Sequence, residues 1–558
     1  MSVIDNIGLR AKPQAHRIGK RPFSLPSRSP FHIILMAGAG LAAALILLAP
    51  AYLLIRTASA GQDTLDTLLK VRTWSVLGST LLLAGSVTLA GIAIAVPLAW
   101  LTACTDLPGR RLWAILAALP LVIPSYVAAF IYASILTPKG LLQQQLYPLT
   151  GIEKLPNIYG FPGAFLVLTL ISYPYILLTT RAAFTRLDPA LTEAARSLGV
   201  SPWGAFRRVT LPTLRPAIAA GGLLTALYVM RDFGAVTMMQ YSTFTRIIYN
   251  RYVGYKLTEA AAMALILVGV TAVILLFEQR SRGRAQYARL SIGAARQRQP
   301  VKLGFWKIPA LFFVGGVVFS SLIVPAAGLL YWFGRGWRQD WGVRDLSAPT
   351  TNIASLLNLI QPAGNSLLAA LLAALLTMAL ALPIAILAVR HPGKLSRFFE
   401  QTTYASYALP GIVIALALVF FGTNYAGSLY QTLPMLLAAY VILFLPQAVG
   451  SERASLLQVS SSLEEAGRSL GKRPFAVFRA ITLPLVRPGL LAGGALVFLT
   501  AMKELPATLI LSPLGFNTLS VQIWGSISEA FFARAAAPTL LLLLLSSVPL
   551  ALLNLREK

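Results

Sequence analysis

The chain is short of charge, histidine and cysteine for its length. Of its 558 residues 12% are charged and 56% are hydrophobic, whereas an ordinary soluble domain is roughly a quarter charged. The single cysteine, Cys104, excludes an intrachain disulfide and a cysteine metal cluster. The three histidines, His16, His32 and His391, are too few and too scattered for an imidazole-rich metal site. These shortages exclude a soluble multidomain enzyme, a disordered chain and a disulfide scaffold.

What the chain has instead is a series of long apolar runs. A helix needs about 20 apolar residues to cross a bilayer, and the runs provide enough length for 12 spans. Membrane strands would show alternating ten-residue segments rather than continuous runs. We therefore predict an all-α integral membrane protein with spans inside residues 33–55, 73–105, 112–138, 155–180, 216–240, 260–277, 308–334, 346–389, 401–451 (two spans), 488–512 and 535–555.

The net charge of +28 is distributed in the way a membrane protein requires. With the N-terminus inside, 33 of the 47 Lys and Arg fall in cytoplasmic segments and 12 fall outside, while Arg231 and Lys503 lie in or near spans. This positive-inside bias predicts that both termini are cytoplasmic. It also favours contact of the basic segments with anionic lipid over a nucleic-acid partner. The first apolar run has full membrane length and no convincing cleavage site, so we expect a retained helix rather than a signal peptide.

An internal repeat divides the chain into two halves. The segment Glu193–Gly199 (EAARSLG) matches Glu465–Gly471 (EAGRSLG) at an offset of 272 residues, from 193 to 465. The same offset pairs Pro174 with Pro446, Arg181 with Arg453, Pro202 with Pro474, Phe206 with Phe478, Thr210 with Thr482, and Arg231-Asp232 with Lys503-Glu504. Six spans in each half leave both halves in one orientation, so their pseudo-two-fold axis runs along the membrane normal.

These features predict four segments along the chain. They are a basic cytoplasmic segment at 1–30, a six-helix half at 31–278, a basic cytoplasmic linker at 279–307 and a second six-helix half at 308–558.

The repeated loop has the sequence of a helix, a turn and a second helix. Asp188-Pro189 is typical of a helix start, and Gly199 is typical of a left-handed helix end. Ser201-Pro202 predicts a second short helix that ends near Leu211-Pro212. The predicted first helix places apolar or small side chains on one face, namely Leu191, Ala194, Ala195 and Leu198.

The second copy of the loop follows the same plan. There we expect Ser462 to cap the first helix, Gly471 to end it and Pro474 to start the next one. Gly467 stands where the first copy has alanine, and glycine weakens a helix by roughly 1 kcal/mol, so this helix is expected to be looser. One loop of this kind could simply pack on its own membrane domain. Two copies in equivalent positions favour docking to a partner that is itself two-fold symmetric.

The pattern E-A-A-x-x-x-G, followed by a proline-initiated turn and T-L-P-x-x-x-P, resembles the EAA loop of ABC importer permeases. Its two copies make the chain similar to a fused pair of permease subunits with the type I importer fold. In that family the loop holds the coupling helix, which sits in a groove of the ATPase. By matching position, the resemblance assigns ATPase coupling to Glu193, Ala194, Ala195, Gly199, Glu465, Ala466, Gly467 and Gly471.

The chain contains no G-x-x-x-x-G-K-[ST] segment that could cradle nucleotide phosphates. We therefore expect no cofactor and no catalytic residue in this chain, with ATP and Mg²⁺ bound by a partner. The resemblance implies two copies of a cytoplasmic ABC ATPase, a periplasmic binding protein and a place in the bacterial inner membrane. The outer loops at 137–160, 241–258, 333–362 and 512–534 are expected to receive the binding protein.

Two charged pairs follow apolar runs of 15 residues each, Arg231-Asp232 and Lys503-Glu504. Charges inside spans are costly and usually face a cavity or one another. Neighbouring residues on a helix point about 100° apart, so Arg231 and Asp232 should not pair with each other. Asp232 and Glu504 could form structural ion pairs with other helices, or they could line a translocation path near the symmetry axis. In the second case they are possible transient contacts for a metal cation.

The segments Arg231–Thr237 (RDFGAVT) and Lys503–Leu509 (KELPATL) resemble those of ferric-iron ABC permeases. That resemblance implies a ferric-iron importer with a periplasmic iron-binding protein, and a hard cation prefers oxygen ligands. A fused thiamine permease has the same architecture, and a cationic organic substrate would also favour two acids. A secondary transporter would share the 12 spans but would not need the repeated loop.

Overall fold

The computed structural model describes residues 30–59, 61–138, 140–187, 189–282, 300–338 and 357–556. Regular structure in these ranges is helical, apart from one isolated parallel bridge between Thr105 and Val301. The predicted all-α architecture is therefore confirmed. The predicted basic segment at 1–30 lies outside the described residues except for Pro30, as do residues 283–299 of the predicted linker.

The first half contains thirteen α-helices and two short irregular turns of helix among the described residues. They are α1 (Pro30–Ser59), α2 (Gly61–Leu69), α3 (Val71–Cys104), α4 (Arg110–Leu116), η1 (Leu119–Val122), α5 (Ser125–Leu136), α6 (Leu141–Thr150), α7 (Phe161–Arg186), α8 (Pro189–Ser197), α9 (Pro202–Ala205), η2 (Phe206–Thr210), α10 (Leu211–Arg231), α11 (Gly234–Met238), α12 (Phe244–Val253) and α13 (Leu257–Arg282).

The second half follows the same order. Its described elements are η3 (Gly304–Trp306), α14 (Lys307–Val318), η4 (Phe319–Ile323), α15 (Val324–Arg338), α17 (Ile360–Arg390), α18 (Lys394–Ala405), η5 (Ser406–Ala408), α19 (Gly411–Tyr425), η6 (Gly427–Leu429), α20 (Leu433–Gln458), α21 (Ser461–Ser469), α22 (Pro474–Val477), η7 (Phe478–Thr482), α23 (Leu483–Met502), α24 (Pro506–Leu511), α25 (Leu519–Ser528) and α26 (Phe532–Arg556). From α7 to α10 and from α20 to α23 the two copies correspond at the predicted offset.

The structure supports most of the predicted membrane spans but does not confirm that there are twelve of them. Ten helical stretches in the described residues are long and apolar enough to cross a membrane. The pair α18–α19 is bent by 108° and has the geometry of either a broken eleventh span or a re-entrant loop. The last predicted span corresponds to α26. Its apolar stretch, Phe532–Ser547, is shorter than the other ten. The bend arises at Pro410, which lacks an amide hydrogen and starts α19 in extended conformation.

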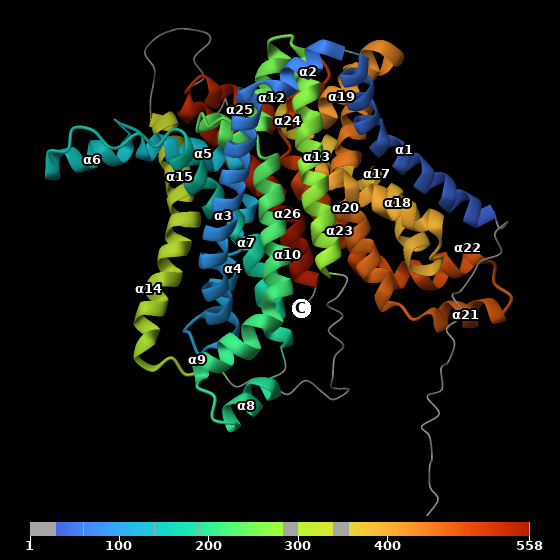
Figure 1. Cartoon of the computed structure of the whole chain (residues 1–558), viewed down its shortest axis with the longest axis horizontal. Helices are drawn as coiled ribbons and strands as arrows, with labels where there is room; N and C mark the ends of the chain where they lie inside the picture. The colour runs from blue at the N-terminus through green and yellow to red at the C-terminus, as the bar shows by residue number, and fades with distance from the viewer. Residues whose placement is uncertain are drawn as a thin grey trace, which may run out of the picture.

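The first helix of each half packs against the opposite half. Helix α1 contacts α17, α18 and α19, whereas α14 contacts α3 and α4, and α15 contacts α5 (Figure 1). Helices α1 and α14 are apolar on all sides, so no face of either can be assigned from the sequence. Because the exchange interleaves the halves, they form one body rather than two separable domains.

Close packing inside each half depends on a repeated glycine. A Cβ atom at Gly221 of α10 would lie 2.7 Å from the Cα atom of Ile176 in α7. At Gly493, the equivalent position in α23, a Cβ atom would lie 2.6 Å from Ser451 Oγ of α20. Small residues let membrane helices approach closely, and these two contacts hold the charged ends of α10 and α23 in equivalent places.

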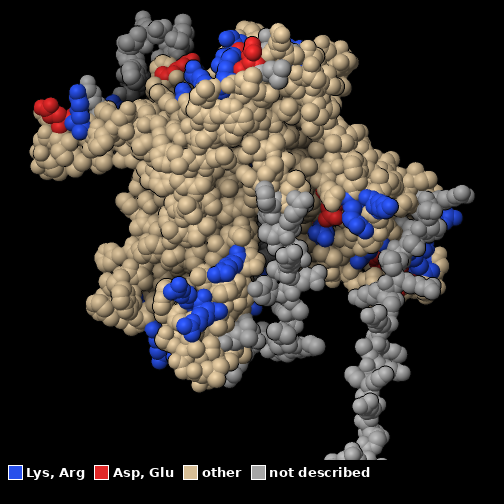
Figure 2. Space-filling model, viewed as in Figure 1, with Lys and Arg blue, Asp and Glu red and all other residues tan. Residues whose placement is uncertain are grey.

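Charged side chains gather at the two ends of the body. Figure 2 shows Lys and Arg near α2 at the upper end and near α8 and α21 at the lower end, with an almost uncharged band between them. This band is what a bilayer requires, because charge is excluded from the hydrocarbon layer.

Candidate functional site

The first candidate site is the pair of repeated loops, α8–α9–η2 and α21–α22–η7. Both helices α8 and α21 end at a glycine in left-handed conformation, with φ +83° at Gly199 and φ +79° at Gly471. No atom lies within 4 Å of the place a Cβ would take at either glycine, so the backbone angle and not crowding demands glycine. The predicted helix, turn and second helix are therefore present in both copies.

Two local predictions for these loops are wrong. The cap of α21 is Ser460, whose hydroxyl accepts the amide of Ser462, because the helix begins two residues earlier than expected. The second helix does not end at Leu211-Pro212. It continues through the π-turn η2 into α10. Pro212 lies just after this π-turn, where the regular hydrogen-bond ladder is already interrupted. Asp188, the predicted cap of α8, lies outside the described residues.

Both loops expose apolar side chains. Leu198, directly after α8, is 84% exposed, and Leu470, directly after α21, is 81% exposed. Glu193 and Glu465 are exposed as well, as are Ala194 and Ala466. An apolar surface with an acidic residue beside it, presented twice, is a shape that a cytoplasmic partner could cover.

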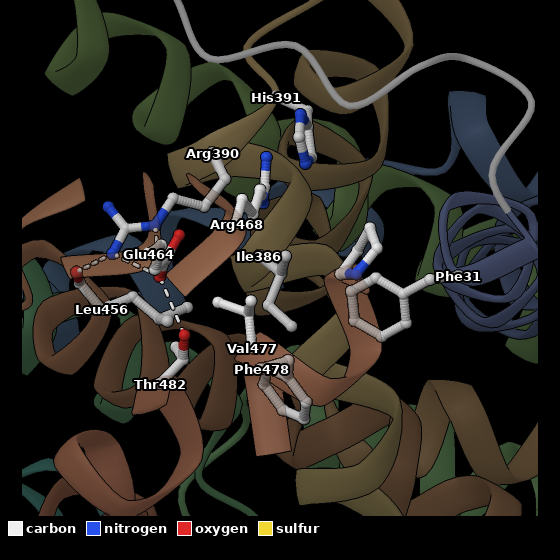
Figure 3. Close-up of a pocket in the computed structure, with 11 residues that line it drawn as sticks. Phe31, Ile386, Arg390, His391, Leu456, Glu464, Arg468, Val477, Phe478 and Thr482 are labelled. Atoms are coloured by element: carbon white, nitrogen blue, oxygen red, sulfur yellow. Dashed lines mark hydrogen bonds and ion pairs between the residues drawn. The ribbon is translucent and has the colours of Figure 1, made fainter. Parts of the chain in front are cut away.

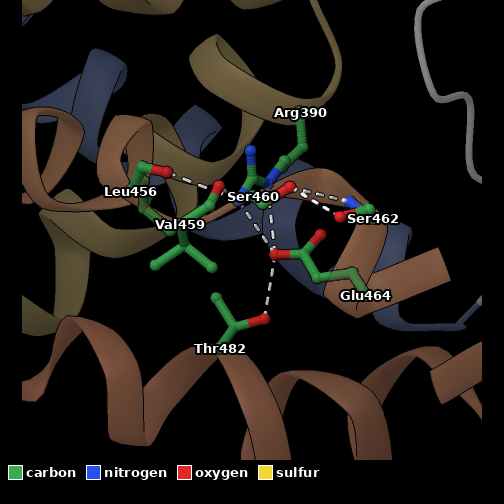
Figure 4. A network of polar contacts seen from close by, with 7 residues as sticks. All are labelled: Arg390, Leu456, Val459, Ser460, Ser462, Glu464 and Thr482. Carbon is green, nitrogen blue, oxygen red and sulfur yellow. Dashed lines mark hydrogen bonds and ion pairs between the residues drawn. The ribbon is translucent and has the colours of Figure 1, made fainter. Parts of the chain in front are cut away.

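Gly467 has a packing role that the sequence did not indicate. A Cβ atom at Gly467 would lie 2.8 Å from Ile481 Cδ1, so glycine lets α21 lie directly on η7. Beside it Glu464, 5% exposed, accepts hydrogen bonds from Arg390 and Thr482 (Figure 4). Sequence reasoning missed Glu464 and Arg390, and the only available signal was an acid in the first turn of a capped helix.

The second candidate site is formed by the charged pairs at the ends of α10 and α23. Asp232 is buried, and its Oδ1 accepts the amides of Ala235 at 2.9 Å and Val236 at 3.3 Å. Glu504 Oε1 accepts the amide of Ala507 at 3.2 Å. Both acids therefore sit at the N-termini of the short helices α11 and α24, where the free amides and the helix dipole favour negative charge.

Neither acid forms the structural ion pair that the sequence left open. In the part of the chain that the structure describes, Asp232, Glu504, Arg231 and Lys503 take part in no ion pair within 4.0 Å. Lys503 Nζ donates to the carbonyl of Leu121 at 2.8 Å, across the boundary between the halves. Arg231 lies within electrostatic range of Glu504, Tyr407 and Tyr175, so it also lies at that boundary.

The two acids differ in length, and their surroundings differ to match. Ser125, which follows Pro124 at the start of α5, hydrogen-bonds to Asp232. The equivalent residue after Pro410 is Gly411, where a Cβ atom would lie 2.7 Å from Glu504 Oε1. The shorter acid, Asp232, lies beside Ser125, and the longer acid, Glu504, lies beside Gly411. The larger neighbour therefore accompanies the smaller acid, and the smaller neighbour accompanies the larger acid.

We expect Gly411→Ser to lower stability, because a Cβ atom there would lie 2.7 Å from Glu504 Oε1 and would displace it from the Ala507 amide. The cost of such overpacking is about 1–3 kcal/mol. Adding Glu504→Asp should restore stability, since the pair then reproduces Ser125 and Asp232. Thermal unfolding of the detergent-purified variants would measure both effects, and equal midpoints for the single and the double variant would contradict this account.

No resident metal centre is evident. Across the described ranges, no three His, Cys, Asp or Glu side chains form a group that could hold a metal ion. The space beside Glu504, lined by Ser366, Tyr440 and Ser520 among others, has no room for a water molecule in this conformation.

Comparison with known proteins matches the chain to membrane components of transport systems. Residues 91–282 and 380–558, one segment in each half, match the family described as binding-protein-dependent transport system inner membrane component. The chain is 34% identical over 534 residues to an Fe(3+)-transport system permease protein of Haemophilus influenzae, covering 95% of this chain and 99% of the relative.

Two further relatives are more distant or shorter. A ferric transport system permease protein of Actinobacillus pleuropneumoniae is 24% identical over 487 residues, which covers 83% of this chain and 68% of the relative. A probable molybdenum ABC transporter permease protein of Haloferax volcanii is 34% identical over 215 residues, covering 38% of this chain and 75% of the relative.

Proposed function

The chain belongs to the family of binding-protein-dependent transport system inner membrane components, and from this premise we propose that it is the permease subunit of an ABC importer for ferric iron. It is a multi-pass inner-membrane transport protein rather than an enzyme. The observation that carries the proposal is the repeat: two loops with exposed apolar faces, joined to two halves that each match the family.

The proposed partners follow from this arrangement. Two copies of a cytoplasmic ABC ATPase dock on α8 and α21 and bind ATP and Mg²⁺, so this chain needs neither. The coupling residues are Glu193, Ala194, Ala195 and Gly199 in the first loop and Glu465, Ala466, Gly467 and Gly471 in the second loop. A periplasmic iron-binding protein delivers the substrate to the outer loops, and the basic segments contact anionic lipid.

Ferric iron is favoured as the substrate by the two relatives named for it, of which one matches nearly the whole chain. We propose that Asp232 and Glu504 border the path between the halves and contact the passing cation. Their oxygen atoms suit a hard cation. Thiamine and a secondary-transporter mechanism are less well supported, since neither accounts for both the ferric relatives and the repeated loops.

The test is reconstitution of the permease in proteoliposomes with an ABC ATPase and a periplasmic iron-binding protein of the same organism. Labelled ferric iron should enter only when ATP and the loaded binding protein are both present. Uptake without ATP would contradict the proposal that the protein is an ABC importer. Uptake of thiamine but not of iron would show that thiamine, and not ferric iron, is the substrate.

The proposed topology gives a separate prediction. Both termini and the linker 279–307 should be cytoplasmic, because that orientation follows the positive-inside rule. In a Cys104→Ala background, a membrane-impermeant maleimide added outside should label a cysteine at Ser347 and leave one at Ser291 unlabelled in sealed cells. Strong labelling at Ser291 would overturn the orientation.

A further inference from the structure

The two docking loops are attached to the membrane body in different ways. In the second loop Glu464 Oε1 lies 3.1 Å from Arg390 Nε and 3.0 Å from its Nη2, and it accepts the Thr482 hydroxyl at 2.9 Å. Arg390 Nη2 also donates to the carbonyl of Val459 at 2.9 Å (Figure 4). One arginine therefore joins the end of α17, the end of α20 and the start of α21.

The surroundings strengthen this contact. The side chains of Arg390 and Glu464 are only 11% and 7% exposed. They border a small hollow of about 30 Å³ whose opposite wall is apolar, formed by residues that include Phe31, Val477 and Phe478 (Figure 3). A charged pair shielded from water interacts more strongly than one at the surface.

The first loop lacks this pair. Helices α3 and α17 align through their internal prolines, Pro97 and Pro383, at an offset of 286 residues. At that offset the position of Arg390 is occupied by Cys104, and at the loop offset of 272 the position of Glu464 is occupied by Thr192. Of the three residues Arg390, Glu464 and Thr482, only Thr482 has an identical counterpart in the first half, namely Thr210.

The end of α3 holds a different partner. Asp106 accepts the amide of Leu303 at 2.9 Å and pairs with Lys307 Nζ at 2.9 Å. The Leu303 amide and the Lys307 ammonium lower the pKa of Asp106 below its usual value. The residues at the end of α3 therefore bind the beginning of the second half, whereas Arg390 at the end of α17 binds the docking helix α21.

The outer ends of α3 and α17 are alike. Thr80 Oγ1 accepts the amide of Phe244 at 3.1 Å, and Ser366 Oγ accepts the amide of Leu519 at 2.8 Å. These contacts connect each helix to the start of α12 or α25 on the outer side. Helix α17 has 31 residues, so at about 1.5 Å per residue it is a rod of about 45 Å. It connects the outer segment before α25 with α21.

We propose that Arg390 and Glu464 are positioning residues that make the second docking helix move with α17, so that the two ATPase copies are coupled to the permease unequally. This rests on the proposed function, because it assigns a role within ATPase docking. The second loop transmits the movement that accompanies delivery of substrate outside, whereas the first loop has no equivalent of the arginine–glutamate pair, since Cys104 and Thr192 stand at those positions.

The test is ATP hydrolysis by the reconstituted complex, measured with and without iron-loaded binding protein. Glu464→Gln and Arg390→Gln should reduce the stimulation by loaded binding protein at least fivefold while ATPase co-purification and basal hydrolysis stay near wild type. Arg390→Lys should give an intermediate value, since lysine keeps the charge but cannot reach several acceptors at once. A merely structural role would instead lower yield, co-purification and basal hydrolysis together.

Glu400→Gln is the matched control. Glu400 of α18 pairs with Arg453 of α20 at 3.3 Å, and this ion pair joins α18 to α20 rather than to α21. This variant should keep the wild-type stimulation. Stimulation that is unchanged in Glu464→Gln, or equally reduced in Glu400→Gln, would overturn the inference. Absence of ATPase co-purification or stimulation with the wild-type permease would overturn the proposed function itself.

Discussion

Reversing the charge of Glu193 and Glu465 together is expected to release the ATPase from an intact permease. Both side chains are exposed on docking helices whose apolar neighbours Leu198 and Leu470 are also exposed. A like-charge contact introduced at an interface costs several kcal/mol, and about 1.4 kcal/mol is a factor of ten in affinity. With two loops affected, ATPase affinity should fall at least about a hundredfold.

The experiment compares Glu193→Lys, Glu465→Lys and the double variant by ATPase co-purification and substrate-stimulated hydrolysis. Permease yield and elution profile are the control, and they should stay at the wild-type level because neither side chain is part of the core. Gly199→Pro should have the same effect on docking, since proline cannot adopt the φ of +83° found there. Unchanged stimulation in the double variant would contradict docking through these loops.

The arrangement of halves and docking loops could be predicted because it depends on local signals. Apolar runs locate the spans, and the repeat from Glu193 to Gly199 identifies equivalent loops without knowledge of contacts. The glycine ends at Gly199 and Gly471 follow from backbone sterics alone. Helix starts were less predictable, because several serines precede α21 and any of them could have capped it.

Long-range polar contacts could not be predicted. Arg390 and Glu464 are 74 residues apart in the sequence, and a search for repeats draws attention to matched residues, whereas this pair occurs in one half only. The exchange of α1 and α14 between halves was invisible for another reason. A helix that is apolar on every side carries no sequence pattern that identifies its neighbour.

The acids at the ends of α10 and α23 show where local reasoning was incomplete. From the sequence we considered two roles for Asp232 and Glu504, a structural ion pair and a place on the translocation path. We did not predict the short helices that begin directly after each acid. The segment Glu504-Leu-Pro506 contains a start signal, since proline favours the first turn and an acid before it favours the free amides. Capping explains why Asp232 tolerates burial without an ion pair, and it adds to the attraction that Glu504 feels from Arg231.

The second large effect is expected from Asp232→Asn combined with Glu504→Gln. Asparagine caps helices about as well as aspartate, and each amide retains an oxygen that can accept the backbone amides of Ala235 or Ala507. The variant should therefore assemble normally and keep its ATPase. Iron uptake should nevertheless be lost, because the two negative charges proposed to border the path are removed.

The expected size follows from electrostatics. A unit charge about 4 Å from another contributes about 4 kcal/mol at an effective dielectric constant of about 20. Since about 1.4 kcal/mol is a factor of ten, uptake of a trivalent cation should fall well over tenfold. Yield and ATPase co-purification report the capping role, whereas uptake of labelled iron reports the path. A well-assembled double variant with normal uptake would show that the acids serve the fold alone, because the caps would then account for everything these residues do.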